Sequence, residues 1–108
     1  MTDGRHAVAE DVSLALHRAV AERLLAQPEL LERARRRVAK WLLDGSVARP
    51  YAEAWRAALE EPVDAVARVL LDPGERARQM RQASPFAGLL SPRERWSLWR
   101  RARGRARP

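Results

Sequence analysis

Prolines divide this sequence into segments whose apolar residues recur with the period of an α-helix, and this pattern restricts the chain to a helical fold. Four prolines begin such segments: Pro28, Pro50, Pro62 and Pro92. Proline is favoured in the first turn of a helix and disfavours helical geometry in the residue before it, so each predicts a helix boundary. No segment alternates with the period of a strand. We therefore predict an all-α fold, a small bundle of five to six short helices.

The helix boundaries follow from these prolines and from the apolar stripes. The expected helices span residues 11–26, 28–43, 50–60, 62–71, 75–82 and 92–102. Asp11 is placed to cap the first helix, and Gly45 is placed to end the second. Ser91 and Glu94 have the spacing of a capping box, in which each side chain bonds the other residue's backbone amide. The last helix therefore has two start signals, the capping box and the proline at its first position.

Large apolar side chains are scarce enough for the core to be predicted residue by residue. Apolar residues form 46% of the 108 residues, but many are alanine, so four tryptophans carry much of the large apolar area. On the third helix, Tyr51 is expected to share a face with Trp55. The expected core comes from the first four helices: Leu16, Val20, Leu24, Leu31, Val38, Trp41, Leu42, Trp55, Leu59, Val66 and Leu70.

The net charge of +7 is concentrated at the C-terminus. Residues 1–92 carry 14 basic against 13 acidic side chains, whereas residues 93–108 carry 7 arginines against the single acid Glu94. We expect a flexible leader at residues 1–9, one helical domain at residues 10–103 and a basic tail at residues 104–108. Such a tail attracts nucleic acid, an acidic protein or an anionic membrane, or is simply solvated.

The sequence contains neither cysteine nor a long uninterrupted apolar segment. Without cysteine there are no disulfides and no thiolate metal sites, which is compatible with the reducing cytosol. Charged residues interrupt the apolar stretch at residues 12–26, so it matches neither a membrane-spanning helix nor a signal peptide. We therefore expect a cytoplasmic protein that does not bind membranes.

The residues needed for catalysis are missing from the sequence. His6 and His17 have no second ligand at metal-binding spacing, and the adjacent Glu60 and Glu61 diverge on a helix instead of pairing as acid and base. Neither a phosphate-binding glycine loop nor a nucleophile elbow occurs. We therefore expect no enzymatic activity, no catalytic or metal-binding residue and no cofactor.

Two arginine-rich segments are compatible with nucleic acid. The run at residues 33–40 either follows phosphates or forms the solvated face opposite an apolar stripe. The C-terminal candidates for phosphate contacts are Arg101, Arg103, Arg105 and Arg107. The chain has no asparagine and few glutamines, the side chains that read adenine, so sequence-specific base recognition is not expected.

Large apolar groups are concentrated in residues 84–99, next to arginines, a composition typical of binding hot spots. We predict these partner-binding residues: Ser84, Pro85, Phe86, Leu89, Leu90, Arg93, Arg95, Trp96, Trp99 and Arg100. In the alternative interpretation, the apolar members of this set fold back as a lid over the first four helices.

A family resemblance begins in the same region, where residues 81–95 are RQASPFAGLLSPRER. This segment resembles the C-terminal signature of small helical bacterial antitoxins encoded beside nucleotidyltransferase-like toxins of the AbiEii class. Residues 51–55, YAEAW, and the helix that contains Trp41 are similar to the middle region of the same proteins. The resemblance covers most of the chain from Leu14 to Trp99.

The resemblance implies a type II toxin–antitoxin system, in which this chain binds and neutralises a toxin that modifies tRNA with nucleotides. Its arginines would then meet acidic catalytic carboxylates of the toxin, or DNA. Two other classes of function remain compatible with the sequence. One is a small basic transcriptional regulator that binds nucleic acid, and the other is a structural helical adaptor.

Overall fold

Six α-helices and one short 3-10 turn form the part of the chain that the computed structural model describes: the backbone of residues 4–105 and the side chains of residues 12–104. In chain order they are α1 (Gly4–Ala26), η1 (Pro28–Leu30), α2 (Leu31–Asp44), α3 (Arg49–Leu59), α4 (Val63–Leu71), α5 (Glu75–Arg81) and α6 (Pro92–Arg105). Residues 4–105 contain no strand, so the predicted all-α fold is confirmed.

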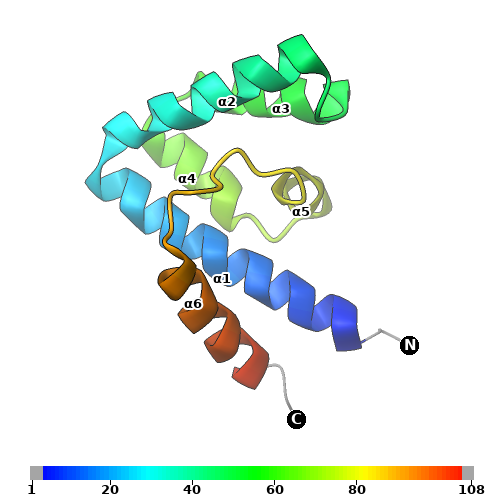
Figure 1. Ribbon diagram of the computed structural model, residues 1–108, viewed down its shortest axis with the longest axis vertical. Helices are drawn as coiled ribbons and strands as arrows, with labels where there is room; N and C mark the ends of the chain where they lie inside the picture. The colour runs from blue at the N-terminus through cyan, green and yellow to red at the C-terminus, as the bar shows by residue number, and fades with distance from the viewer. Residues whose placement is uncertain (1–3, 106–108) are drawn as a thin grey trace.

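Helix α1 is the central element of the bundle (Figure 1). Helix α4 packs against α1, and α6 runs antiparallel to α1, with its first turn beside Arg23 in the C-terminal part of α1. Helices α2 and α3 pack against each other far from α6, at the opposite end of the molecule. Helix α5 and the loop after it, residues 82–91, lie between these two ends. The molecule therefore has an α2–α3 end and an α6 end.

The core is centred on Trp55 of α3, whose side chain is fully buried. Its Nε1 donates a hydrogen bond of 2.9 Å to the Met80 carbonyl oxygen, and its ring meets the Phe86 ring edge to face, with centroids 5.7 Å apart. Most predicted core residues are buried around it: Val20, Leu24, Leu31, Val38, Leu59, Val66 and Leu70. Three others, Leu16, Trp41 and Leu42, pack against this core but are only partly buried.

The ends of two helices are closed by groups with well-defined geometry. Gly45 ends α2 in the left-handed conformation, with φ of 70°, and its amide donates to the Trp41 carbonyl at 2.9 Å. Side chains with a Cβ rarely adopt this φ, which explains the glycine there. At the end of α4, the buried Arg81 guanidinium donates to the carbonyl oxygens of Leu70, at 3.3 Å, and Asp72, at 2.6 Å. Arg81 thus satisfies backbone acceptors that the helix itself leaves unpaired.

Two sequence predictions about the first helix are corrected by the structure. Helix α1 begins at Gly4, so residues 4–9 of the predicted leader are helical, and Asp11 lies inside the helix instead of capping it. No proline interrupts residues 4–10, and their alanines favour helix. On α3 the buried face contains Ala52, Trp55 and Leu59, and 37% of Tyr51, one turn before Trp55, is exposed.

The last helix is also longer than predicted. Helix α6 continues to Arg105, because arginine and alanine propagate a helix well and Gly104 alone does not end it. Residues 104 and 105 of the predicted tail are therefore helical. Residues 1–3 of the predicted leader and residues 106–108 of the predicted tail lie outside the described residues.

Candidate partner-binding surface on α6

The predicted partner-binding segment divides into a buried loop and an exposed helix. In the loop, Pro85, Phe86, Leu89 and Leu90 are buried, and Phe86 packs on Trp55. The hydrophobic effect places these side chains inside, because together they close the core between α1 and α5. Their prediction as surface contacts is therefore corrected. The alternative prediction, that they fold back over the first helices, describes this loop.

Ser84 ties the loop to α1 through the buried His17. His17 Nδ1 lies 2.8 Å from the Ser13 carbonyl oxygen, and His17 Nε2 lies 2.9 Å from Ser84 Oγ. Since a carbonyl oxygen only accepts, Nδ1 carries the proton and Nε2 accepts from the Ser84 hydroxyl. Burial lowers the pKa of His17, the hydrogen bond to Ser13 opposes this change, and the charge of Arg81 adds to it. Neutral His17 is therefore a structural link between α1 and the loop.

Two polar contacts fix the start of α6 on α1. Arg23 donates a hydrogen bond of 2.8 Å to the Leu89 carbonyl oxygen and forms an ion pair with Glu94. Glu94 accepts from the Ser91 amide at 2.9 Å, and Ser91 Oγ accepts from the Glu94 amide at 3.1 Å, so the predicted capping box is confirmed. The Ser91 amide first, and Arg23 second, lower the pKa of Glu94. The helix start is thereby held in a defined position.

An aromatic stripe lies along α6. Trp96 and Trp99 stack with ring centroids 5.0 Å apart and an interplanar angle of 14°, and 58% of Trp96 is exposed. The Arg103 guanidinium lies 4.9 Å from the centroid of the Trp99 ring, in cation–π geometry. The stack limits the motion of both indoles, so the aromatic surface needs little further ordering when a partner covers it.

A groove of about 570 Å³ lies between α6 and α1. On the α1 side it is lined by Ala15 and Ala19, whose short side chains leave space between the two helices. On the α6 side it is lined by Ser97 and Leu98. The sequence analysis did not identify this groove, because it exists only after α6 has packed on α1. The spacing of Ala15 and Ala19, one helical turn apart, was the only available signal.

The charges along this groove favour an anionic ligand group. Arg18, Arg93 and Arg101 line it together with Glu22 and Glu94. Glu94 is already paired with Arg23, which does not line the groove. Three guanidinium groups therefore face a single carboxylate, that of Glu22, which has no ion-pair or hydrogen-bond partner among the described residues. A carboxylate or phosphate of a partner would find compensating charge there.

The other arginines of the predicted site are exposed. Three of them have no hydrogen-bond or ion-pair partner among the described residues: Arg93, Arg95 and Arg100. Arg101 makes only a long hydrogen bond of 3.4 Å to Ser97. The predicted phosphate contacts Arg105, by its side chain, and Arg107 lie outside the described residues. We define the α6 face as Arg93, Trp96, Trp99, Arg100 and Arg103, which are exposed except for the half-buried Trp99.

The described residues also lack a metal-binding cluster and a membrane-spanning helix. Within the described part of the chain, no group of three or more His, Asp or Glu side chains is placed to hold a metal ion. None of its helices is both long enough and apolar enough to cross a membrane.

Comparison with protein-family models, with curated proteins and with solved structures gives no match for this chain. The partner is therefore inferred from the chemistry of the α6 face and of the groove beside it.

Proposed function

We propose that this chain is a binding protein that neutralises a nucleotidyltransferase-like toxin by covering it with the α6 face. One observation carries the proposal: the exposed Trp96 stacks on the half-buried Trp99, and the pair is flanked by arginines that have no partner within the described chain. Rigid aromatic side chains beside arginine are typical of binding hot spots. Aromatic burial then supplies most of the binding energy, and the arginines accelerate association with an acidic surface.

The groove between α1 and α6 specifies the chemistry of the partner further. Arg93 and Arg101 line it on one side and Arg18 on the other, so it suits an acidic side chain that projects from the toxin. Nucleotidyltransferase-like enzymes, to which the sequence resemblance points, carry catalytic carboxylates. We therefore propose that acidic residues near the toxin's active site enter this groove.

The residues that carry the sequence resemblance support the proposal indirectly, because they position α6 instead of forming the α6 face. Within residues 81–95, Arg81 closes the end of α4, Ser84 binds His17, and Phe86 packs on Trp55. These residues hold the loop in place and so position α6. We accordingly assign partner recognition to α6 and a structural role to the loop before it.

Co-purification tests the proposal directly. The tagged full chain is expressed with the product of the neighbouring gene, and a stoichiometric complex that survives high salt is expected. Trp96→Ala with Arg100→Ala should abolish the complex and restore toxicity to cells. Leu43→Ala is a matched control, because 89% of Leu43 is exposed, on a helix far from α6. A complex unaffected by the α6 double variant would contradict the proposal.

The alternative function is a small transcriptional regulator that binds nucleic acid through the C-terminal arginines. Arg101 and Arg103 are exposed on α6 and can approach phosphates. The same purification distinguishes the two functions. An antitoxin retains a protein at high salt, whereas a regulator of this kind releases nucleic acid as the salt concentration rises.

A further inference from the structure

We propose that α2 carries a second binding surface, which holds the phosphate backbone of a nucleic acid and is separate from the α6 face. We call it the α2 stripe and define it as Arg33, Arg36, Arg37 and Lys40. It lies at the α2–α3 end of the molecule, away from α6 (Figure 1). The proposal does not depend on toxin neutralisation.

The geometry of α2 gives the stripe its shape. Arg36 and Arg37 lie three and four positions after Arg33, and Lys40 lies seven positions after it, so the four residues share one side of the helix over about 10 Å. Leu31, Ala34 and Val38 are buried on the opposite side and fix the orientation of the helix. All four cationic side chains are exposed. The stripe is therefore a firmly supported line of positive charge.

The charges of the stripe are not neutralised within the described chain. None of its four residues forms an ion pair or side-chain hydrogen bond there. Two of the nearby acids have other partners: Glu32 contacts Arg35, and Asp44 accepts hydrogen bonds from Ser46. The hydrogen bonds from Ser46 lower the pKa of Asp44, and the positive charge of Lys40 lowers it further by a smaller amount.

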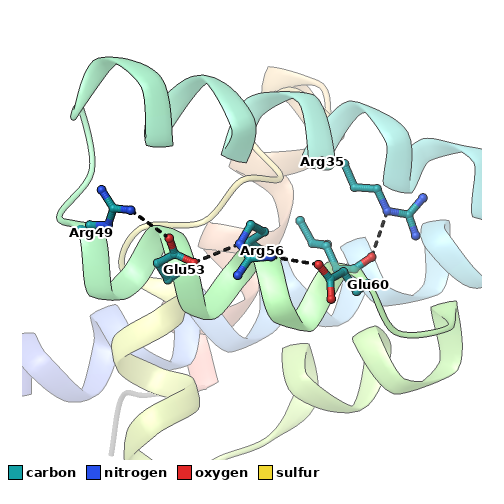
Figure 2. Close-up of polar contacts among 6 residues, drawn as sticks. Arg35, Arg49, Glu53, Arg56 and Glu60 are labelled. Atoms are coloured by element: carbon teal, nitrogen blue, oxygen red, sulfur yellow. Dashed lines mark hydrogen bonds and ion pairs between the residues drawn. The ribbon is translucent and has the colours of Figure 1, made fainter.

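On α3, the helix next to α2, the charged side chains are paired with one another instead of left without partners (Figure 2). Its charged side chains form an alternating row: Arg49 pairs with Glu53, Glu53 with Arg56, and Arg56 with Glu60. On α2, the Arg35 guanidinium points toward α3 and donates to the Leu59 carbonyl at 2.9 Å. Arginines at this end are therefore either engaged in internal contacts or gathered in the α2 stripe.

The chemistry of the stripe favours phosphates over a protein surface. It contains no aromatic side chain, and its face ends at Leu43 and Asp44. A row of cationic side chains whose exposed large apolar neighbour, Leu43, lies only at its end attracts a regular line of negative charge, which the backbone of a double helix provides. Since no asparagine or glutamine lies on α2, the contacts should be independent of base sequence.

Salt-dependent binding tests the proposal. The full chain is titrated into a labelled DNA duplex of about 20 base pairs, in KCl from about 50 to about 200 mM. Fluorescence anisotropy measures the affinity. The α2 variant is Arg33→Gln, Arg36→Gln, Arg37→Gln and Lys40→Gln. Its affinity should fall at least tenfold, and the slope of log K against log[salt] should become less steep by about 3 to 4. Circular dichroism confirms that each variant remains folded.

A control variant distinguishes the contribution of the α2 stripe from the effect of lowering the net charge of the chain. Arg49→Gln, Arg56→Gln, Arg68→Gln and Arg76→Gln remove the same charge from helices α3 to α5 and should change the affinity less than threefold. A second comparison uses Arg100→Gln, Arg101→Gln and Arg103→Gln on α6. Equal losses for the α2 and control variants, or loss only in the α6 variant, would overturn the proposal.

Two further ligands identify the source of the phosphates. DNA and RNA duplexes share the phosphate backbone, so the α2 variant should lose affinity for both, and the tighter-binding duplex identifies the preferred polymer. Vesicles containing phosphatidylserine test an anionic membrane instead. If the α2 stripe binds such vesicles and contributes nothing to duplex binding, the proposal is wrong.

Discussion

Helices α2 and α6 are both rich in arginine, yet they are joined to the rest of the molecule in different ways. Helix α2 buries Leu31, Ala34 and Val38, and its cations face outward. Helix α6 buries Ala102, packs the partly buried Leu98 against the core and pairs Glu94 with Arg23 at its start, while part of its aromatic surface stays exposed. Arginine content therefore does not define what a helix binds. The kind of partner depends instead on whether the large apolar side chains of the helix are buried or exposed.

The four tryptophans show the same difference between the two ends of the molecule. Trp55 is fully buried and Trp41 partly buried at the α2–α3 end, whereas at the α6 end Trp96 is 58% exposed and Trp99 is half-buried. We expect substitutions of buried groups at the first end to affect the whole fold. Substitutions at the α6 end should affect only that helix or its binding.

The largest expected effect is that of Trp55→Ala. The change empties a fully buried position and removes the hydrogen bond to the Met80 carbonyl, so a loss of about 3 to 5 kcal/mol in unfolding free energy is expected. Urea unfolding followed by circular dichroism measures it. Trp41→Ala is the control and should lose less, because Trp41 is only partly buried. Similar losses of unfolding free energy for the two variants would contradict the proposed difference between the buried Trp55 and the partly buried Trp41.

Acidification should weaken the link between α1 and the loop that leads to α6. Burial lowers the pKa of His17 in the folded chain below its ordinary value of 6.5. As the pH falls, His17 therefore becomes protonated in the unfolded chain before it does so in the folded chain. The stability that neutral His17 contributes is complete above pH 6.5 and is lost as the pH falls through and below that value.

Thermal unfolding between pH 7.5 and pH 5.5, about one unit on either side of the ordinary histidine pKa of 6.5, measures this effect. The unfolding temperature of the wild-type chain should decrease over this range, and that of His17→Gln should change less. An equal pH dependence in both chains would show that His17 is not the responsible group.

Removing the helix cap should act on α6 alone. Ser91→Ala deletes the side-chain acceptor of the Glu94 amide, and such a loss costs about 1 kcal/mol. Hydrogen exchange should increase at the amides of α6 and remain unchanged in α2. Ser97→Ala, in the middle of the same helix, is the control and should have little effect. Faster exchange in α2 would mean that the two ends are not independent.

The smallest effect on stability is expected for Trp96→Ala. Because Trp96 is 58% exposed, the unfolding free energy should change by less than about 0.5 kcal/mol, while partner binding is lost. Urea unfolding and co-purification of the same preparation measure the two quantities. A large loss of stability would assign Trp96 to the core and remove the distinction from Trp55.

Local signals in the sequence predicted most of the fold. Gly45 and the Ser91–Glu94 capping box act within a few residues, so the sequence shows where α2 ends and where α6 begins. The N-terminal end of α1 was missed, because residues 4–10 carry neither a stop signal nor a clear apolar stripe. The role of Arg81 at the end of α4 was also missed, since it depends on the packing of α5.

The candidate site was predicted only in part, because exposure is decided by tertiary packing. Phe86 and Trp96 are both large aromatic residues near arginines, and nothing in the local sequence distinguishes them. Phe86 is buried because α3 places Trp55 beside it, whereas no element covers most of Trp96. The groove between α1 and α6 depends on residues far apart in the sequence, so it was not predicted.

The contacts that hold α6 also determine when the α6 face can form during folding. Arg35 and the Leu59 carbonyl, at the α2–α3 end, are 24 residues apart, whereas Arg23 and Glu94 are 71 residues apart and His17 and Ser84 are 67 apart. Closing a longer loop costs more chain entropy, and contacts between distant residues slow folding. We therefore expect α2 and α3 to dock before α6. In that order of events the α6 face and its groove form only when folding is complete, so a partner that recognises both would reject folding intermediates.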